Sequence, residues 1–253
     1  MVDFKNVTFS YDKKKDVLKN VSFTLNDGEC AVLLGPNGIG KTTILKCIIG
    51  ELKVKEGTIT INGTNINKIK YHELADRIAF VPQSINANEL TVGETILLGR
   101  LPTFKIYPKK EDYEALDKAL TEFELEEIRD KKTNEISGGE KQKCAIARAY
   151  IQNTSTIIFD EPTSNLDIKA QTAIVSLIDK ITKENKKSTL LSVHDINLAL
   201  ALADKLILLK DNAIYKIVTP EEVTNEDLSI VYDTNIKIIE VEGRRLIINE
   251  NNN

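Results

Sequence analysis

The chain has 253 residues, of which 42% are apolar and 28% charged, a composition that is ordinary for a folded protein. Its formal net charge of −4 at pH 7 argues against a protein that binds nucleic acid or anionic lipid through a basic surface. The sequence has no run of about 18 apolar residues that could span a membrane, and we expect no secretory signal. Three separated cysteines are expected to be reduced and buried: Cys30, Cys47 and Cys144.

The N-terminal third predicts strands, because its apolar residues alternate or form short runs. A continuous apolar run that ends at Gly35 is typical of a buried strand leading into a loop. The helix expected after that loop ends before Gly50. The expected elements are strands over residues 2–9, 21–25, 30–34, 58–61 and 78–81 and a helix over residues 41–49.

The middle of the chain is far more charged than the rest. Twenty of the 39 residues from Lys105 to Lys143 carry a charge, which is about twice the overall proportion. One apolar stripe at helical spacing runs through this segment, formed by Tyr113, Leu116, Leu120 and Phe123. We therefore expect helices to be inserted here between parts that are rich in strands.

Strand and helix patterns alternate after residue 155, which predicts a mainly parallel sheet covered by helices. The capping-box pattern Thr219–Glu222, with Pro220 in the first helical position, predicts another helix start. The expected elements are strands over 156–159, 188–193 and 206–209, helices over 168–181 and 196–203, and a hairpin over 236–248.

Residues 35–42 read GPNGIGKT, the GxxxxGK[ST] pattern of a phosphate-binding loop. The loop lies between a predicted strand and a predicted helix, the context that the pattern requires. Its glycines allow main-chain N–H groups and the helix dipole to face an anion. Lys41 would reach the β- and γ-phosphates and the Thr42 hydroxyl would bind Mg²⁺, so the ligand is expected to be a nucleoside triphosphate.

A second pattern places two carboxylates, Asp160 and Glu161, directly after the apolar run at 156–159. Ligands bind at the carboxyl ends of strands in sheets of this kind. There Asp160 can hold Mg²⁺ and Glu161 can polarise an attacking water. The alternative is a solvated strand end, and the phosphate loop makes the functional interpretation the stronger one.

A serine and two glycines at 137–139 precede a helix rich in alanine and form a second possible anion-binding turn. Such a turn is by itself usually a flexible connection. One nucleotide needs only one phosphate loop, however. The second turn therefore suggests that each site is completed between two molecules.

With all these motifs in order, the chain resembles the ATP-binding cassette of ABC transporters over residues 1 to about 240. The resemblance implies an α/β fold: a P-loop NTPase core with a mainly parallel sheet, an N-terminal antiparallel β subdomain and an inserted helical subdomain. It implies one cassette domain over residues 1–253. The helical subdomain would cover about 85–154 and a C-terminal extension about 218–253.

The resemblance also assigns roles to single residues. Tyr11 matches the aromatic residue that stacks on adenine, Gln83 the glutamine that senses Mg²⁺ and the membrane partner, and His194 the switch histidine. The implied catalytic residues are Glu161, His194 and Lys41, and the implied Mg²⁺ ligands are Thr42, Gln83 and Asp160. The implied ATP-binding residues are Tyr11, Gly35, Pro36, Asn37, Gly38, Ile39, Gly40, Lys41, Thr42 and Thr43, with Ser137, Gly138, Gly139 and Glu140 acting on the partner copy's ATP and Asp167 in the D-loop.

Two residues depart from the family's LSGGQ signature. Ile136 replaces leucine, which is a near-isosteric apolar change. Glu140 replaces glutamine and would put a carboxylate near the ribose of the nucleotide held by the partner copy. We expect this change to tune affinity without abolishing binding.

The chain is similar in sequence to importers of ferric siderophores, haem and cobalamin at residues 91–102, 160–168, 194–199 and 219–223. The resemblance then implies an ATPase at the cytoplasmic face of the membrane. Its partners would be a second cassette, two permease subunits and, indirectly, an extracytoplasmic binding protein, with no nucleic acid. Residues 84–105 are expected to receive a helix of the permease.

Two alternatives remain: a zinc or manganese importer, and a soluble cassette such as an iron–sulfur assembly ATPase. A GTPase or small-molecule kinase is disfavoured by the signature turn and by the lack of an NKxD guanine motif in the sequence.

Overall fold

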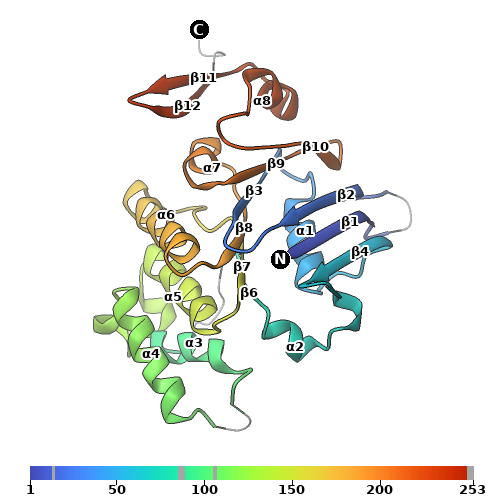
Figure 1. Cartoon of the computed structure of the whole chain (residues 1–253). Helices are drawn as coiled ribbons and strands as arrows, with labels where there is room; N and C mark the ends of the chain where they lie inside the picture. Colours follow the sequence, from blue (N-terminus) through green and yellow to red (C-terminus); the bar gives the residue numbers. More distant parts are fainter. Residues whose placement is uncertain (13–14, 85–88, 105–106, 250–253) are drawn as a thin grey trace. The chain divides into compact units, whose positions relative to one another are not determined.

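The computed structural model describes residues 1–12, 15–84, 89–104 and 107–249. The chain divides into two compact units, one formed by residues 1–69 and 188–253 and the other by residues 70–187. Among the described residues they contain a four-stranded antiparallel sheet, a set of mainly parallel strands, a two-stranded antiparallel hairpin and several helices (Figure 1). The predicted α/β fold class is therefore confirmed.

The first unit begins with an antiparallel sheet of strand order β2-β1-β4-β5, and Figure 1 shows β1, β2 and β4 side by side. Phe4 of β1 lies opposite Phe23 of β2, and their rings stack with centroids 4.6 Å apart. This contact uses the inward-facing residues that the alternation predicted. The strands span Val2–Phe9 (β1), Leu18–Leu25 (β2), Glu56–Ile61 (β4) and Thr64–Asn65 (β5), followed by the 3₁₀ turn Ile66–Lys68.

The second set of strands in this unit has the order β10-β9-β3-β8. β3 is parallel to both β8 and β9, whereas β10 returns antiparallel to β9. Every residue of β3 and β8 is buried, which explains their continuous apolar runs. The elements are β3 (Cys30–Leu34), α1 (Lys41–Ile48), β8 (Ser188–Ser192), α7 (Ile196–Leu202), β9 (Lys205–Lys210) and β10 (Ala213–Val218).

The C-terminal helix α8 spans Asn225–Tyr232, so the helix start predicted at Pro220 is wrong. Glu222 does accept a hydrogen bond from the Thr219 N–H at 3.1 Å, but residues 220–222 form a turn. The helix begins instead at a second capping box. There Thr224 accepts from the N–H of Asp227, and Asp227 accepts from the N–H and hydroxyl of Thr224.

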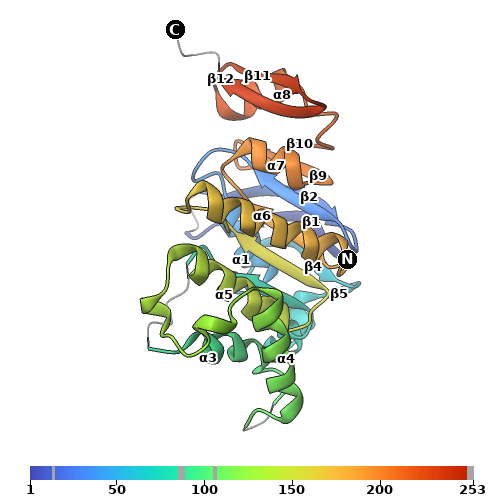
Figure 2. The ribbon, with the colours of Figure 1, turned by 90° about the vertical axis from the view of Figure 1, so that its left-hand side faces the viewer.

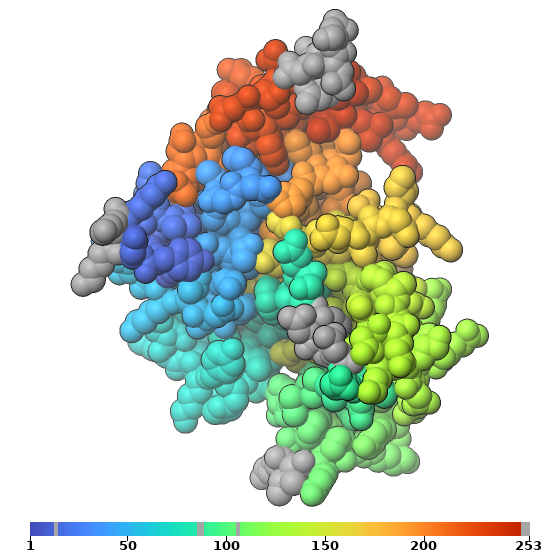
Figure 3. Space-filling model, turned by 180° about the vertical axis from the view of Figure 1, so that it is seen from behind, coloured from blue at the N-terminus to red at the C-terminus, as the bar shows by residue number. Residues whose placement is uncertain are grey.

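The predicted hairpin forms from β11 (Ile236–Val241) and β12 (Arg244–Asn249). Side chains of the neighbouring helices bind main-chain N–H groups along its edges: Asn225 binds Ile238, and Asn197 binds Ile247. The hairpin and α8 lie together in Figure 2 and form the red region of Figure 3. The hairpin is therefore anchored to helices of its own unit.

Helix α8 is also anchored by an ion pair between Asp227, which is 4% exposed, and Lys216 of β10, at 2.9 Å. Burial raises the pKa of Asp227, but hydrogen bonds from Lys216 and Thr224 outweigh burial, so the net pKa is lowered. A carboxylate with a lowered pKa stabilises the fold above its unfolded pKa of about 3.9. That stability is lost as the pH falls through the folded pKa.

We expect Asp227→Asn to lower the free energy of unfolding by about 2 kcal/mol at neutral pH, because Lys216 loses its buried partner but is itself partly solvated. The variant should also lose less stability than the parent below about pH 4. Urea unfolding across pH measures both effects. Asp233→Asn is the control, since Asp233 is exposed in its pair with Lys210; equal effects of the two substitutions would contradict the prediction.

The second unit holds the parallel pair β6 (Ile78–Val81) and β7 (Thr156–Asp160), with a covering set of helices. Leu116, Leu120 and Phe123 are buried as predicted, whereas Tyr113 is 46% exposed on the first turn of α4. A tyrosine tolerates that position because its hydroxyl can stay in water. The helices are α2 (Tyr71–Ala75), α3 (Val92–Leu97), α4 (Lys110–Glu122), α5 (Gly138–Ile151) and α6 (Ile168–Lys183), with 3₁₀ turns at Leu98–Arg100, Glu126–Ile128 and Thr133–Glu135.

All three cysteines are buried, as predicted. Burial raises the pKa of both Cys47 and Cys144 to about 12, so neither thiol ionises at neutral pH. Strand β10 and helix α3 are not among the elements that the sequence predicts. Among the helices within the described ranges, none has both the length and the hydropathy needed to span a bilayer.

Candidate active site

The phosphate loop of residues 35–42 connects β3 to α1, as predicted. Lys41 is only 5% exposed, and its Nζ donates to the carbonyl oxygens of Gly35 at 2.6 Å and Pro36 at 3.2 Å. The loop therefore folds back on its own lysine and holds a positive charge at its centre. Asn37 and Gly38 at the tip of the loop are exposed.

Gly40 precedes α1 with φ 111°, a left-handed conformation that favours glycine. A Cβ atom at this position would lie 2.8 Å from Leu18 Cδ2 and 3.0 Å from the Val17 carbonyl oxygen. Both the backbone conformation and the available space thus require glycine at the start of this helix.

Tyr11 lies beside the same helix. Its hydroxyl is 3.2 Å from Thr43 Oγ1, and its ring packs edge-on against Phe9 with centroids 4.9 Å apart. The side chain is nevertheless 65% exposed. It can therefore offer a ring to a ligand at the loop while its hydroxyl stays anchored.

The carboxylates after β7 lie in the second unit. Asp160 is 8% exposed and is the last residue of the strand. Glu161 follows in a left-handed conformation with φ 49°, which costs a non-glycine residue about 1–2 kcal/mol. Such strain occurs preferentially at functional sites.

Gln83, which follows β6, forms hydrogen bonds with Glu161 and Ser164. Its Nε2 donates to Glu161 Oε2 at 3.0 Å and to Ser164 Oγ at 3.2 Å. The main-chain N–H of Ser164 in turn donates to the Glu161 carbonyl oxygen at 3.1 Å. One amide therefore joins the end of β6, the predicted catalytic glutamate and the loop before α6.

The signature turn of residues 136–140 leads into α5 with Ser137 as N-cap. Glu140 Oε2 accepts hydrogen bonds from the Ser137 N–H at 2.7 Å and from the Ser137 hydroxyl at 2.6 Å. These hydrogen bonds are the main reason that the pKa of Glu140 is lowered. The role of Glu140 near a ribose stays a prediction, and within this chain its carboxylate binds the signature serine.

A cavity of about 450 Å³ connects the signature turn to the D-loop. Asp167 lines it and caps α6 by accepting from the Ala170 N–H at 2.8 Å. Little space is available for a side chain at Gly139, where a Cβ atom would lie 3.0 Å from Ala170 Cβ. The residues lining this cavity include Ser137, Gly138, Gly139, Glu140, Asn165, Leu166 and Asp167.

The predicted site residues are divided between the two units. In residues 1–69 and 188–253, Tyr11 contacts the helix that follows the phosphate loop, and His194 is exposed between β8 and α7. In residues 70–187, Gln83 joins Glu161, and the signature turn lies beside Asp167.

Sequence reasoning missed two contacts of these residues. Ser164 shares the Gln83 amide with Glu161, and no local pattern indicates a contact between residues 81 positions apart. The buried Tyr232 hydroxyl lies beside the main chain of Gly35, although the two do not form a well-aligned hydrogen bond. Burial raises the pKa of Tyr232 to about 12, an effect that the Gly35 main chain reduces.

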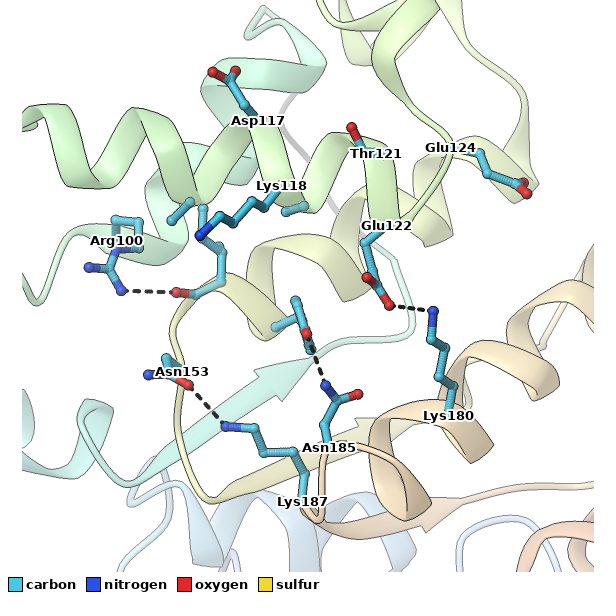
Figure 4. A pocket seen from close by; sticks show the side chains of 14 residues that line it. Arg100, Asp117, Lys118, Thr121, Glu122, Glu124, Asn153, Lys180, Asn185 and Lys187 are labelled. Carbon is cyan, nitrogen blue, oxygen red and sulfur yellow. Dashed lines mark hydrogen bonds and ion pairs between the residues drawn. The ribbon is translucent and has the colours of Figure 1, made fainter.

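A larger pocket of about 1080 Å³ lies in the second unit, among α4, the end of α5 and the end of α6 (Figure 4). Its polar side chains are largely paired with one another, for example Lys180 with Glu122 at 2.6 Å and Lys187 with Asn153 at 3.2 Å. None of the predicted site residues lines it. This pocket is therefore separate from the motif residues.

Comparison with known proteins agrees with the motif residues. The family model described as ABC transporter matches residues 18–164. The petrobactin import ATP-binding protein of Bacillus subtilis is 34% identical over 97% of this chain and 98% of its own length.

Two solved structures are also similar. One, described as a metal-chelate type ABC transporter in an inward-facing conformation, has a TM-score of 0.85 at 25% identity, over 97% of this chain and 95% of that one. The other is a dimeric ATP-binding cassette in a post-hydrolysis state with ADP and Pi, with a TM-score of 0.78 at 33% identity, over 87% and 99%. The chain therefore belongs to the ABC transporter family, and it is one of the ATP-binding, ATP-hydrolysing proteins of that family.

Proposed function

We propose that this ATPase powers an importer of iron chelates, within the group that takes up siderophores, haem and cobalamin. Its similarity to a petrobactin import protein and to a metal-chelate type transporter supports this substrate class. The ATPase would lie at the cytoplasmic face of the membrane, bound to two permease subunits that receive cargo from an extracytoplasmic binding protein. The whole chain, residues 1–253, would act as one cassette.

ATP fits the phosphate loop on chemical grounds. The buried Lys41 ammonium, now held by two carbonyl oxygens, would exchange them for phosphate oxygens. Mg²⁺ suits the hydroxyl of Thr42 and the carboxylate of Asp160, with the Gln83 amide as a further oxygen donor, since it prefers oxygen ligands and a small number of carboxylates. When bound, it would neutralise charge on the phosphates.

Hydrolysis would need two copies of the chain. We propose that each ATP lies between residues 35–43 of one copy and residues 137–140 of the other, with Tyr11 against the adenine. Glu161 would act as general base, and His194 would contact the γ-phosphate. The dimeric cassette structure with ADP and Pi supports this arrangement.

The observation that carries the proposal is the Gln83 amide, which binds both Glu161 and Ser164. Gln83 opens the segment that we expect to face the permease, and Glu161 is the proposed base. A displacement of this segment would therefore change the hydrogen bonding of the catalytic carboxylate directly. Coupling between transport and hydrolysis requires a link of this kind.

The permease is proposed to dock on residues 84–105, of which 85–88 and 105, including Ile85 of the expected apolar set, lie outside the described residues. Leu101 is 53% exposed, and the preceding Leu98 is an exposed apolar residue as well. We expect Leu101→Asp to leave the ATPase activity of the isolated protein within about twofold, because surface substitutions rarely disturb the fold. It should reduce co-purification with the permease and uncouple hydrolysis from uptake.

Uptake and ATPase activity measured together in vesicles test this prediction. Tyr71→Asp is the matched control, since Tyr71 is 77% exposed and lies outside the segment. Loss of both activities in Leu101→Asp would show that the segment is only structural. Retention of both would show that it faces solvent and would remove the docking proposal.

A further inference from the structure

In the signature turn, the Glu140 carboxylate accepts hydrogen bonds from both donor groups of Ser137, its N–H and its hydroxyl. Oε2 of Glu140 accepts from the Ser137 N–H at 2.7 Å and from the Ser137 hydroxyl at 2.6 Å. In return, the Glu140 N–H donates to the Ser137 hydroxyl oxygen at 3.3 Å. A single carboxylate oxygen thus holds the only hydroxyl proton that this serine can offer to an anion.

This carboxylate is charged, and Lys131 and Lys143 contribute less to its lowered pKa than the Ser137 hydrogen bonds do. Its lowered pKa, caused chiefly by the Ser137 hydrogen bonds, keeps it ionised at neutral pH. The nearby Lys143 is paired with Glu124 at 2.8 Å, and among the described residues Glu140 itself forms no ion pair. A hydroxyl bound to a carboxylate at 2.6 Å is a charge-assisted bond, roughly twice as strong as a neutral one.

The position of Glu140 places its charge in the cavity where a ligand would approach. Glu140 lines the same cavity of about 450 Å³ as Ser137 and Gly139. An incoming anion that binds the Ser137 hydroxyl must therefore displace the Glu140 carboxylate from that hydroxyl. It must also approach the negative charge that remains on Glu140.

We infer that Glu140 is a positioning residue that competes with the phosphate of ATP for the Ser137 hydroxyl and so raises the ATP concentration at which two copies associate. The inference rests on the proposed function, in which Ser137 of one copy binds the ATP of the other. It makes the charge of Glu140, and not only its shape, a determinant of closure.

Glu140→Gln isolates this charge. Both donors of Ser137 bind the same oxygen, Oε2, so the amide oxygen of glutamine can accept both bonds and retain the helix cap. Glu73→Gln is the control. Glu73 also accepts a main-chain N–H at the start of a helix, from Lys70 at 3.3 Å, but it lies outside residues 84–105 and does not line the cavity.

The experiment measures ATP-dependent dimerisation by light scattering in the Glu161→Gln background, which is expected to retain ATP. Added Glu140→Gln should lower the ATP concentration for half-dimerisation by about tenfold, as removal of a nearby like charge predicts. Added Glu73→Gln should leave that ATP concentration unchanged. Raising the salt from about 0.05 M to about 0.5 M should reduce the difference in half-dimerisation ATP concentration between Glu140 and Glu140→Gln, because salt screens the repulsion between Glu140 and ATP.

The possible results separate the two proposals. Equal midpoints with glutamate and glutamine at position 140 would overturn the competition by Glu140 while leaving the two-copy site intact. An equal shift in Glu73→Gln would overturn it as well, by assigning the effect to hydrogen bonding at a helix start. Absence of ATP-dependent dimers in every variant would overturn the two-copy site itself, and the role of Glu140 with it.

Discussion

Glu161→Gln is expected to bind ATP normally and to hydrolyse it at least about 100-fold more slowly, which is the usual effect of removing a positioned general base. Glu161 is the carboxylate that receives the Gln83 amide at 3.0 Å. A glutamine has nearly the same shape and can still accept that bond, but it cannot take a proton from water. The change therefore separates binding from chemistry.

ATPase assays with saturating MgATP measure the rate, and size-exclusion chromatography with and without MgATP measures the trapped dimer. Asp179→Asn is a suitable control, because Asp179 is an exposed carboxylate on α6 whose pair with Lys183 is also exposed. A hydrolysis rate within about threefold of that of the parent would show that Glu161 is not the general base. A variant that holds ATP as a monomer would contradict the two-copy site.

The phosphate loop could be predicted from sequence because every feature that defines it is local. The pattern at 35–42, the apolar run before it and the helix after it lie within 20 residues, and the structure places them as β3, loop and α1. The glycine at position 40 is required by its own φ of 111° and by the adjacent Val17 and Leu18. Local backbone rules thus account for this part of the site.

The Gln83–Glu161–Ser164 link could not be predicted in the same way. The residues are 78 and 81 positions apart, and they meet because β6 and β7 pair in parallel. Parallel pairing brings the carboxyl ends of both strands to one edge. The resemblance named Gln83 and Glu161 separately, but only the pairing shows that one amide binds the carboxylate.

Two local details show where a sequence pattern is ambiguous. The Thr219–Glu222 and Thr224–Asp227 segments both have a capping-box pattern, and only the second starts a helix. The same S-x-x-E pattern at Ser137–Glu140 could have shown that the glutamate binds its own N-cap serine. The family resemblance points instead to the missing glutamine at position 140 and to a nucleotide held by another copy of the chain.

Lys41→Ala is expected to reduce ATPase activity to background and to weaken MgATP binding, with the fold intact by circular dichroism. The lysine is nearly fully buried, and its ammonium binds two loop carbonyl oxygens. Alanine leaves those carbonyl groups facing the place where the phosphates are expected, without the positive charge that offsets them. Near-normal turnover would exclude the loop as the phosphate site.

Mixing this variant with Ser137→Arg tests whether the signature acts across two copies. The arginine should block the site that Ser137 completes while leaving the phosphate loop of its own copy unchanged. In a mixed dimer one site carries both substitutions and the other carries neither, so activity should return to a fraction of the parent value, whereas each variant alone stays inactive. If the signature acted within its own copy, each copy would keep one damaged site and mixing would restore nothing. A titration of one inactive variant into the other, followed by ATPase assay, therefore distinguishes a site shared by two copies from one contained in a single chain.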